Sequence, residues 1–324
     1  MKRLISLLLC ALLIIPALAE DAPDFEPIPW DIKVSPNLPN PDCYLPNNGG
    51  YHDDSIDIQI NVTYWTQDLQ QVDAPGEGTT TVMSARVKLT DVSQFRTGFA
   101  NKYPSKQARH VNDMTKRFNA VMGIDGDYCL YHEQGIVVRN GQTLRMRPHK
   151  GRDELIVDEN GDFHLITCTT QAKWDEYIAG GGTVLHAFCF GPALVVDGVP
   201  LTSLDDVTID NGKAKKAQRM VIGQIGKLEY LILTNEGPES TAPKSVGFDL
   251  VQMANLCVQF GLDNAYNLDG GSSSTIALNN QKINSPSSHK NRMVGDCIWF
   301  ATLVKEETWR EKESVQTVEV EENK

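Results

Sequence analysis

The stretch Ala265-Tyr-Asn-Leu-Asp-Gly-Gly-Ser-Ser-Ser-Thr275 joins a short apolar segment to a polar loop. It predicts a strand over Ala265 to Leu268 that ends at Asp269, after which Gly270 and Gly271 turn the chain sharply. Three serines and a threonine then offer hydroxyl groups and backbone amides that could hold a phosphate or a sugar, with Asp269 at the lip. An ordinary tight turn with an Asx cap has the same pattern, so both interpretations stay open.

A helix is predicted just before this strand, because apolar residues recur there at spacings of three and four. These residues are Val246, Leu250, Met253, Ala254 and Cys257. Pro243 and Ser245 lie near the expected start of the helix, and Gly261 follows its expected end.

Most of the remaining pattern indicates β-strands. Ile56, Ile58, Ile60 and Val62 alternate with polar residues, which is the period of a half-buried strand. Further apolar runs are separated by turn residues such as Asn140-Gly141 and Asn160-Gly161. They cover residues 81–89, 121–124, 135–138, 155–157, 184–196 and 219–233. We therefore expect an α+β fold, a strand-rich single domain around a mixed β-sheet with a few packed helices.

The N-terminal residues have the pattern of a secretory signal. Lys2 and Arg3 precede an apolar run over residues 4–15, and Ala17-Leu-Ala19 resembles a cleavage site. Cys10 could indicate a lipid anchor, but Leu9 stands before it where a small residue is expected. The predicted segments are a signal peptide over 1–19, an extended lead-in over 20–50, a domain over 51–304 and a charged flexible tail over 305–324. The protein is thus expected to be secreted or attached to the cell envelope, with no integral membrane segment after the signal is removed.

Removal of residues 1–19 would take away two basic residues and change the net charge from -12 to -14. This acidic excess argues against a nucleic-acid partner. The cysteine count would fall from seven to six, which permits up to three disulfides, and we expect at least one. Cys189 and Cys257 lie in apolar runs and are typical of buried thiols.

A second polar motif is Gly123-Ile-Asp-Gly-Asp-Tyr128. Asp125 and Asp127 would face the same side of a strand, and two close carboxylates can raise the pKa of one of them. Such a pair suits general acid catalysis or cation binding, whereas a surface turn with two solvated acids is the alternative.

Arg219 opens the run Arg-Met-Val-Ile-Gly-Gln-Ile-Gly226 and could clamp a phosphate through two nitrogens, or form a structural ion pair. Arg292, in Asn291-Arg-Met-Val-Gly-Asp296, permits the same two interpretations. The chain lacks a G-x-S-x-G elbow, a P-loop and an H-E-x-x-H motif, which disfavours the enzyme classes that depend on them.

Taken in order, the motifs resemble the phosphodiester glycosidase family, which contains N-acetylglucosamine-1-phosphodiester glycosidases and exopolysaccharide-related bacterial proteins. The matching elements are Asp125-Gly-Asp-Tyr128, Phe190-Gly-Pro192, Arg219 to Gly223, and Asn267 to Ser273. The resemblance extends over most of residues 51–304. One departure is Asp125, which stands where many relatives carry Asn; a charged carboxylate there would be unfavourable beside a phosphate.

The resemblance implies an exported hydrolase that cleaves a sugar-1-phosphodiester, acting on cell-envelope or exopolysaccharide glycans and requiring no cofactor. It implies Asp269 and Asp127 as catalytic residues. The residues implied for substrate binding are Asp125, Gly126, Arg219, Gly270, Gly271, Ser272 and Ser273. A non-catalytic carbohydrate-binding module of the cell envelope is the alternative. A divalent cation held by Asp125, Asp127 and Asp269 is a further one.

Overall fold

The structure is a computed structural model that describes residues 25–205, 215–240, 244–285 and 291–310. The predicted signal peptide and residues 311–324 of the predicted tail lie outside these ranges. No helix within them is both long and apolar enough to cross a membrane.

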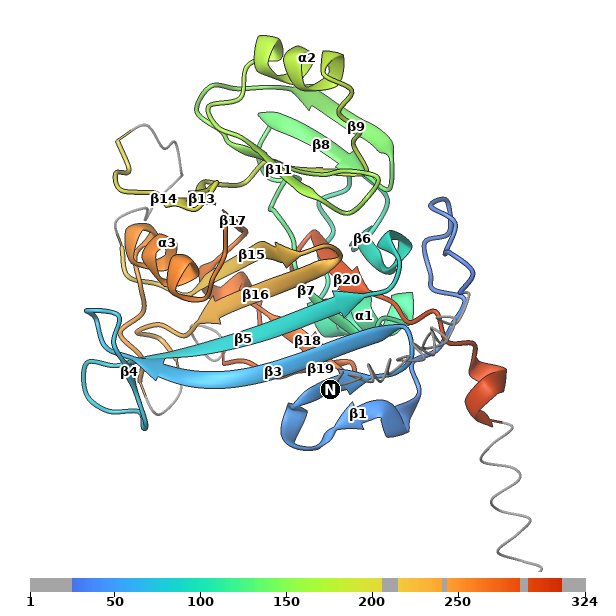
Figure 1. The fold of residues 1–324 in the computed structure, drawn as a ribbon, viewed down its shortest axis with the longest axis horizontal. Helices are drawn as coiled ribbons and strands as arrows, with labels where there is room; N and C mark the ends of the chain where they lie inside the picture. Colours follow the sequence, from blue (N-terminus) through green and yellow to red (C-terminus); the bar gives the residue numbers. More distant parts are fainter. Residues whose placement is uncertain (1–24, 206–214, 241–243, 286–290, 311–324) are drawn as a thin grey trace, which may run out of the picture.

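Three β-sheets make up most of the described fold (Figure 1). The largest has ten strands, with β4 (Gln71–Val72) attached to β3 at one side. Its other strands lie in the order β1 (Tyr44–Leu45), β2 (Gly50–His52), β3 (Ile56–Trp65), β5 (Thr80–Leu89), β16 (Glu229–Asn235), β15 (Arg219–Gly226), β17 (Asn264–Asn267), β13 (Ala193–Val196) and β14 (Val199–Pro200).

Two five-stranded sheets accompany the large one. The upper sheet of Figure 1 has the order β11 (Phe163–Ile166), β10 (Glu154–Val157), β12 (His186–Phe188), β8 (Gly135–Arg139) and β9 (Gln142–Arg147). The other has the order β19 (Gln281–Lys282), β18 (Ile276–Leu278), β7 (Met122–Asp125), β20 (Asp296–Phe300) and β6 (Phe95–Phe99).

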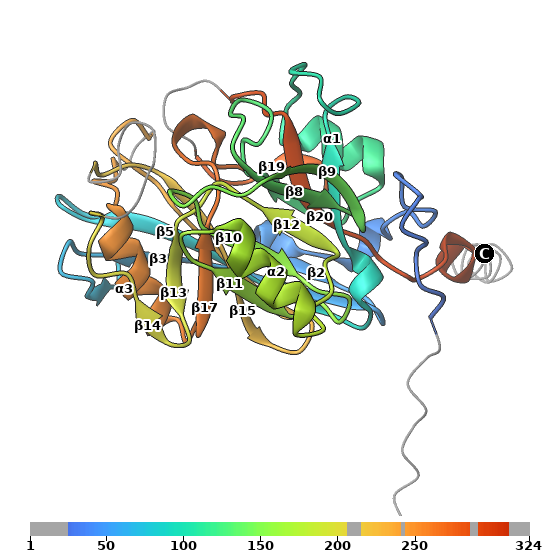
Figure 2. The same ribbon diagram turned by 90° about the horizontal axis from the view of Figure 1, so that it is seen from above.

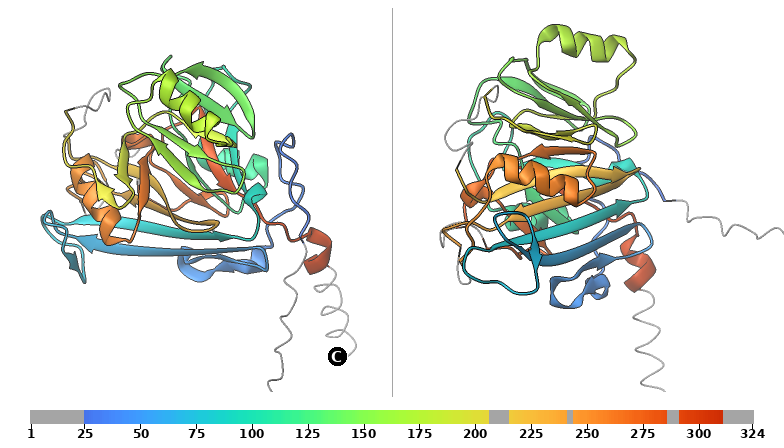
Figure 3. Two further views of the ribbon diagram at one scale, coloured as in Figure 1. Left: turned by 45° about the horizontal axis from the view of Figure 1, so that its top comes forward. Right: turned by 60° about the vertical axis from the view of Figure 1, so that its left-hand side comes forward.

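Three α-helices each cover one sheet; they are α1 (Val111–Phe118), α2 (Gln171–Ala179) and α3 (Leu250–Gln259). Alternate residues of β15 face opposite sides: Met220 and Ile222 enter the main core between the sheets, while Val221 packs with α3. Helix α1 packs on the outer face of the β7–β20 sheet, and Trp174 of α2 packs on the outer face of the β8–β12 sheet (Figures 2 and 3). The large sheet therefore has α3 on one face and the two smaller sheets on the other, and α1 and α2 cover the outer faces of the smaller sheets.

The strand-rich class is confirmed, but the expectation of a mixed sheet is wrong for the described strands, which all pair antiparallel. The chain between β16 and β17 shows why a mixed sheet was expected, because it contains the helix α3. A helix between two strands is typical of parallel neighbours. Here β15 lies between β16 and β17 and pairs antiparallel with both.

Local sequence explains where several elements begin. The predicted helix before the site starts at Leu250 rather than near Val246, because Asp249 caps it: the Asp249 carboxylate accepts from the Gln252 amide, and Gln252 accepts from the Asp249 amide. Asn140-Gly141 and Asp197-Gly198 both have positive φ, as two-residue hairpin turns require.

The predicted disulfide is not present, since all six cysteines of the described residues are free thiols. Cys189 and Cys257 are fully buried, as their apolar surroundings predicted.

Candidate functional site

Three chain segments that are far apart in sequence meet at the end of β7. Residues of β7 pair with β18 on one side and β20 on the other, so Asp125 lies opposite Cys297. Beyond the strand, the Gly126 amide donates to the Asp296 carbonyl, and the Asp269 amide donates to the Gly126 carbonyl, both at 3.1 Å. The structure thereby brings four carboxylates together: Asp125, Asp127, Asp269 and Asp296. Three of them were predicted as site residues, and Asp296 was not.

Only glycine fits at position 126, where β7 ends beside the start of β20. A Cβ atom on Gly126 would lie 2.4 Å from the Asp296 carboxyl group, closer than real contacts allow. The glycine therefore permits the β7 end and the β20 start to approach, and it binds its neighbours through the backbone alone.

Asp127 is fully buried, and both of its carboxylate oxygens already accept hydrogen bonds. Oδ1 accepts from Nη2 of Arg139 at 2.8 Å and from the Cys129 amide at 3.3 Å. Oδ2 accepts from the Cys189 amide at 2.8 Å. The same Arg139 nitrogen donates to Asp296 Oδ2 at 3.1 Å, so one guanidinium bridges two buried carboxylates.

The two carboxylates that Arg139 bridges differ in pKa: that of Asp127 is lowered and that of Asp296 is raised. Burial works against the charge of Asp127, but Arg139 and the Cys189 amide outweigh it, so the pKa of Asp127 lies below its ordinary value. Burial and the neighbouring Asp127 charge raise the pKa of Asp296, and Arg139 offsets this only in part. Arg139 itself stays charged, since burial is outweighed by Asp127 and the pKa of its guanidinium is raised.

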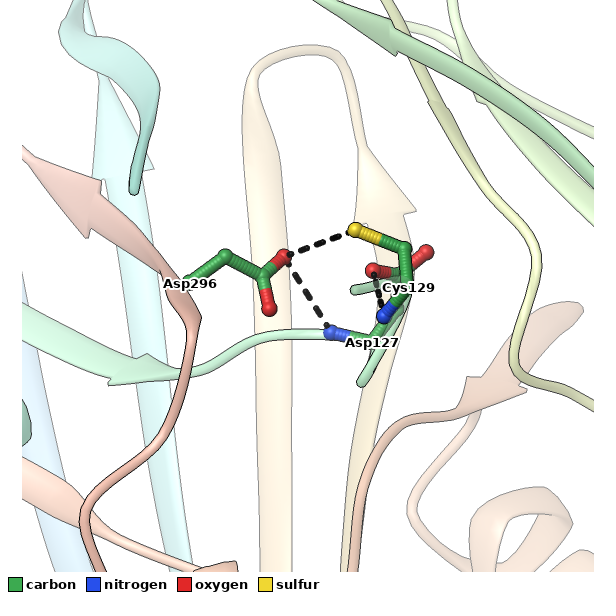
Figure 4. A group of neighbouring side chains, drawn as sticks. All are labelled: Asp127, Cys129 and Asp296. Atoms are coloured by element: carbon green, nitrogen blue, oxygen red, sulfur yellow. Dashed lines mark hydrogen bonds between the residues drawn. The ribbon is translucent and has the colours of Figure 1, made fainter. Parts of the chain in front are cut away.

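Figure 4 shows Asp127, Cys129 and Asp296, whose ligand atoms lie within 4.8 Å of one another. This group differs from the cation set considered above, which combined Asp125, Asp127 and Asp269. Arg139 already supplies a cation to these atoms, because its Nη2 contacts both carboxylates and lies 3.8 Å from the Cys129 sulfur. The geometry thus favours an internal ion network here, and a divalent cation remains only an alternative.

Asp125 is fully buried at the end of β7. Its Oδ1 accepts from the Thr275 amide at 2.8 Å, while Oδ2 has no partner among the described residues. Complete burial and the charge of Asp269 raise its pKa well above the ordinary value, against the opposing Thr275 amide. The surroundings of Asp125 therefore favour its protonated form. A protonated carboxyl has one donor and one acceptor, as an Asn side chain does.

Asp269 lies at the start of the Gly/Ser loop and is the most exposed of the four carboxylates, at 8%. Its Oδ1 accepts from the Gly270 amide at 2.9 Å. Burial raises the pKa of Asp269 to about 6, although the Ser273 hydroxyl, the Arg292 charge and the Gly270 amide act in the opposite direction. Gly270, Gly271 and Ser272 are only half-buried, so the site meets solvent along this loop.

The loop holds polar side-chain atoms that are buried and yet lack a hydrogen-bond partner within the described ranges. They are the hydroxyls of Ser274 and Thr275, Oδ1 of Asn267 and Oδ2 of Asp125. Buried polar atoms without partners are costly and rare in folded proteins. Their accumulation beside Asp269 is what a site for a hydroxyl-rich ligand would show.

Two arginines were considered as phosphate contacts, and the structure places them differently. The Arg219 backbone lies beside Gly270, but its guanidinium donates to the carbonyls of Phe248 and Lys215. Burial lowers its pKa to about 10, and Asp249 opposes that shift. Arg292 is exposed and lies over the Tyr128 ring at 5.4 Å, and its charge acts on Asp269.

Arg139 and Asp296 were missed at the sequence level. Arg139 lies directly before the predicted Asn140-Gly141 turn, and the sequence pattern assigned it no role. Asp296 is the first residue of β20, and the rest of that strand, Cys297 to Phe300, is apolar; an acidic residue at such a boundary was the available signal.

Comparison with known proteins gives a consistent assignment. A family model described as phosphodiester glycosidase matches residues 118–301. The zebrafish N-acetylglucosamine-1-phosphodiester alpha-N-acetylglucosaminidase catalytic domain, auto-inhibited by pro-peptide, is similar with a TM-score of 0.59 and 14% identity, over 76% of this chain and 84% of that one. A hypothetical protein from Synechocystis is similar with a TM-score of 0.50 and 14% identity, over 76% and 62%. No curated protein sequence matches. At this identity the two structures establish a shared fold.

Proposed function

The chain belongs to the phosphodiester glycosidase family, and from this premise we propose that it is an exported hydrolase of sugar-1-phosphodiesters. Water adds to the anomeric carbon, the bond from that carbon to the phosphate oxygen breaks, and the phosphate leaves as a phosphomonoester. The observation that carries the proposal is Asp269, a carboxylate that is 8% exposed and has a pKa of about 6, beside buried polar atoms that lack partners among the described residues.

Asp269 is the proposed catalytic carboxylate. Cleavage of a glycosidic bond passes through an oxocarbenium-like state, which a carboxylate stabilises directly or by activating water. A phosphate already leaves readily, so the reaction needs little help from an acid. The Ser272 and Ser273 region and the Asn267 side chain would then contact the sugar.

The phosphate requires local positive charge, since the protein carries a net charge of -12. Arg292 is the exposed cation whose charge reaches Asp269. The amides of Gly270 to Ser273 add donors. The Arg219 guanidinium donates to the Phe248 and Lys215 carbonyls, so we propose that Arg219 positions the loop through its backbone contact with Gly270.

Asp127 was predicted to be catalytic, and that role remains a prediction. Its two oxygens are already occupied by Arg139 and two backbone amides. We therefore propose that Asp127 contributes through its fixed charge and by holding Arg139, rather than by touching the anomeric carbon.

Turnover is tested with purified protein and a methyl phosphodiester of N-acetylglucosamine, the sugar named for the zebrafish relative. The expected products are free sugar and methyl phosphate in equal amounts. Binding of the sugar phosphodiester without products would favour the carbohydrate-binding alternative. Neither binding nor products from this or related sugar-1-phosphodiesters would contradict the proposed function.

Asp125→Asn should keep activity within about twofold of wild type, because the neutral carboxyl and the amide present equivalent hydrogen-bonding groups. Asp125→Ala should lose stability by about 1–3 kcal/mol, since it leaves the Thr275 amide without its acceptor. The raised pKa of Asp125 means that wild type loses stability as pH rises above the ordinary carboxyl range. The melting temperature of Asp125→Asn should therefore exceed that of wild type by a margin that grows between pH 4 and pH 8. A large loss of activity in Asp125→Asn would show that the negative charge is needed.

A further inference from the structure

A cavity with a volume of about 470 Å³ has Arg139 in its lining, and none of the four carboxylates lines it. It is formed by the N-terminal segment at Lys33 and Val34, the end of β6 with the loop after it, the end of α1, and the β8–β9 hairpin. The lining residues are Lys33, Val34, Thr97, Gly98, Phe99, Asn101, Lys102, Tyr103, Arg117, Phe118, Arg139, Asn140, Gln142 and Leu144. This volume is typical of a small-molecule site.

The charge of this cavity is opposite to that of the whole protein. Lys33, Lys102, Arg117 and Arg139 line it, and none of the described lining residues is acidic. Lys33 and Lys102 are exposed, and their ammonium groups have no hydrogen bond or ion pair within the described chain. In a chain of net charge -12, such a local basic surface attracts anions specifically to this place.

Arg139 is the buried member of this basic group. Its side chain is only 5% exposed, and its Nη1 and Nη2 atoms are committed to backbone carbonyls, Asp127 and Asp296. Nε has no acceptor in the described structure and is shielded from solvent. Arg139 therefore contributes basic charge to the cavity wall and makes no direct hydrogen bond to a ligand through Nε.

The remaining lining residues include three aromatic rings, Phe99, Tyr103 and Phe118. Rings of this kind favour a flat apolar group over a bare ion. We propose that the cavity binds a small anionic ligand, a phosphate or carboxylate attached to a ring. Lys33, Lys102 and Arg117 contact the anion, and Arg139 adds basic charge from the cavity wall. The proposal stands on the cavity alone and does not depend on the catalytic role of Asp269.

Calorimetric titration with phenyl phosphate and with benzoate at pH 7 and low salt tests this proposal. Binding of either ring anion is expected, and comparing the two tells whether phosphate or carboxylate is preferred. Phenol, which has the ring without the charge, should bind at least tenfold more weakly. The Asp269→Asn variant should bind the ring anion as wild type does, because Asp269 does not line the cavity.

The paired substitution Lys33→Gln and Lys102→Gln should weaken binding about tenfold. The matched control is Lys88→Gln with Lys227→Gln, which also removes two exposed charges but away from the cavity. The control should change the affinity less than twofold. Absence of ring-anion binding, an unchanged affinity in the Lys33/Lys102 variant, or an equal loss in both variants would overturn the proposal. Because binding is the readout, an inactive protein that binds as expected would contradict only the proposed function.

Discussion

Asp269→Asn is expected to lower kcat/KM for a sugar-1-phosphodiester by about a thousandfold while leaving the fold intact. Asn has the same shape and keeps the oxygen that accepts from the Gly270 amide, so the loop should hold its position. It cannot carry the negative charge that stabilises an oxocarbenium-like state or takes a proton from water, and such carboxylate catalysis contributes about 10²–10⁴-fold. The measurement is sugar release with circular dichroism as the check on folding.

The pH profile gives this prediction a second readout. The pKa of Asp269 is raised to about 6, so kcat/KM of wild type should rise as pH increases through about 6 and the carboxylate ionises. The residual activity of Asp269→Asn should lack this rise. For stability the sign is reversed: because the folded-state pKa is above the ordinary value, ionisation destabilises the native state as pH rises from about 4 to 6. Asp269→Asn should therefore be at least as stable as wild type at pH 7.

Asp263→Asn is the matched control, since Asp263 is an exposed carboxylate just before β17. It should retain wild-type activity and pH dependence. Equal rates for wild type and Asp269→Asn would remove Asp269 from the mechanism, even if the family assignment is correct.

The sequence predicted the parts of the site that depend on local pattern. The strand before Asp269 was expected over residues 265–268 and is found at Asn264–Asn267. Asp125 lies at the end of the predicted apolar run, as the last residue of β7. In both places an apolar strand gives way to glycine, and that transition is visible in a few consecutive residues.

The site residues that the sequence did not predict depend on which distant strands pair. Asp296 joins the site because β20 pairs with β7. Arg139 joins because its strand, β8, belongs to the other five-stranded sheet, and its guanidinium contacts Asp127 and Asp296. The residues near Asp296 and Arg139 do not specify which strands pair or which sheets pack together. The direction of the Arg219 side chain is a similar case, since its carbonyl acceptors belong to Lys215 and to Phe248, just before α3. Long-range register decides these contacts, and a single sequence does not display it.

Arg139→Met is expected to cause the largest loss of stability, about 3–5 kcal/mol in the free energy of unfolding at pH 7. The substitution leaves Asp127 and Asp296 buried without their shared cation, and breaking one side of a buried ion pair has this magnitude. Met retains much of the apolar contact with the Phe188 ring, over which the guanidinium lies at 4.4 Å. Urea denaturation measures the loss, and Arg139→Lys should give an intermediate value because it keeps the charge but not the planar fork.

Arg86→Met supplies the control for removal of an arginine. Arg86 pairs with Glu229 at the surface and its side chain is 53% exposed, so the expected loss is only about 0–1 kcal/mol. Adding Asp296→Asn to Arg139→Met should recover part of the stability, since one uncompensated carboxylate is then neutral. That recovery in a double-mutant cycle would separate loss of charge from loss of packing.

The pH dependence identifies the cause of the loss. In wild type, Arg139 keeps the pKa of Asp127 below its ordinary value, so this ion pair stabilises the fold above that range and its contribution falls away in strong acid. Without Arg139, burial and the mutual repulsion of Asp127 and Asp296 oppose their ionisation, and the Cys189 amide offsets this only in part at Asp127, so the variant should lose stability as pH rises. The difference between wild type and Arg139→Met should therefore be small near pH 3 and largest above pH 7. A loss below about 1 kcal/mol at pH 7, or a larger loss that is the same at pH 3 and pH 7, would show that Arg139 acts by packing and not as the counter-charge of the two carboxylates.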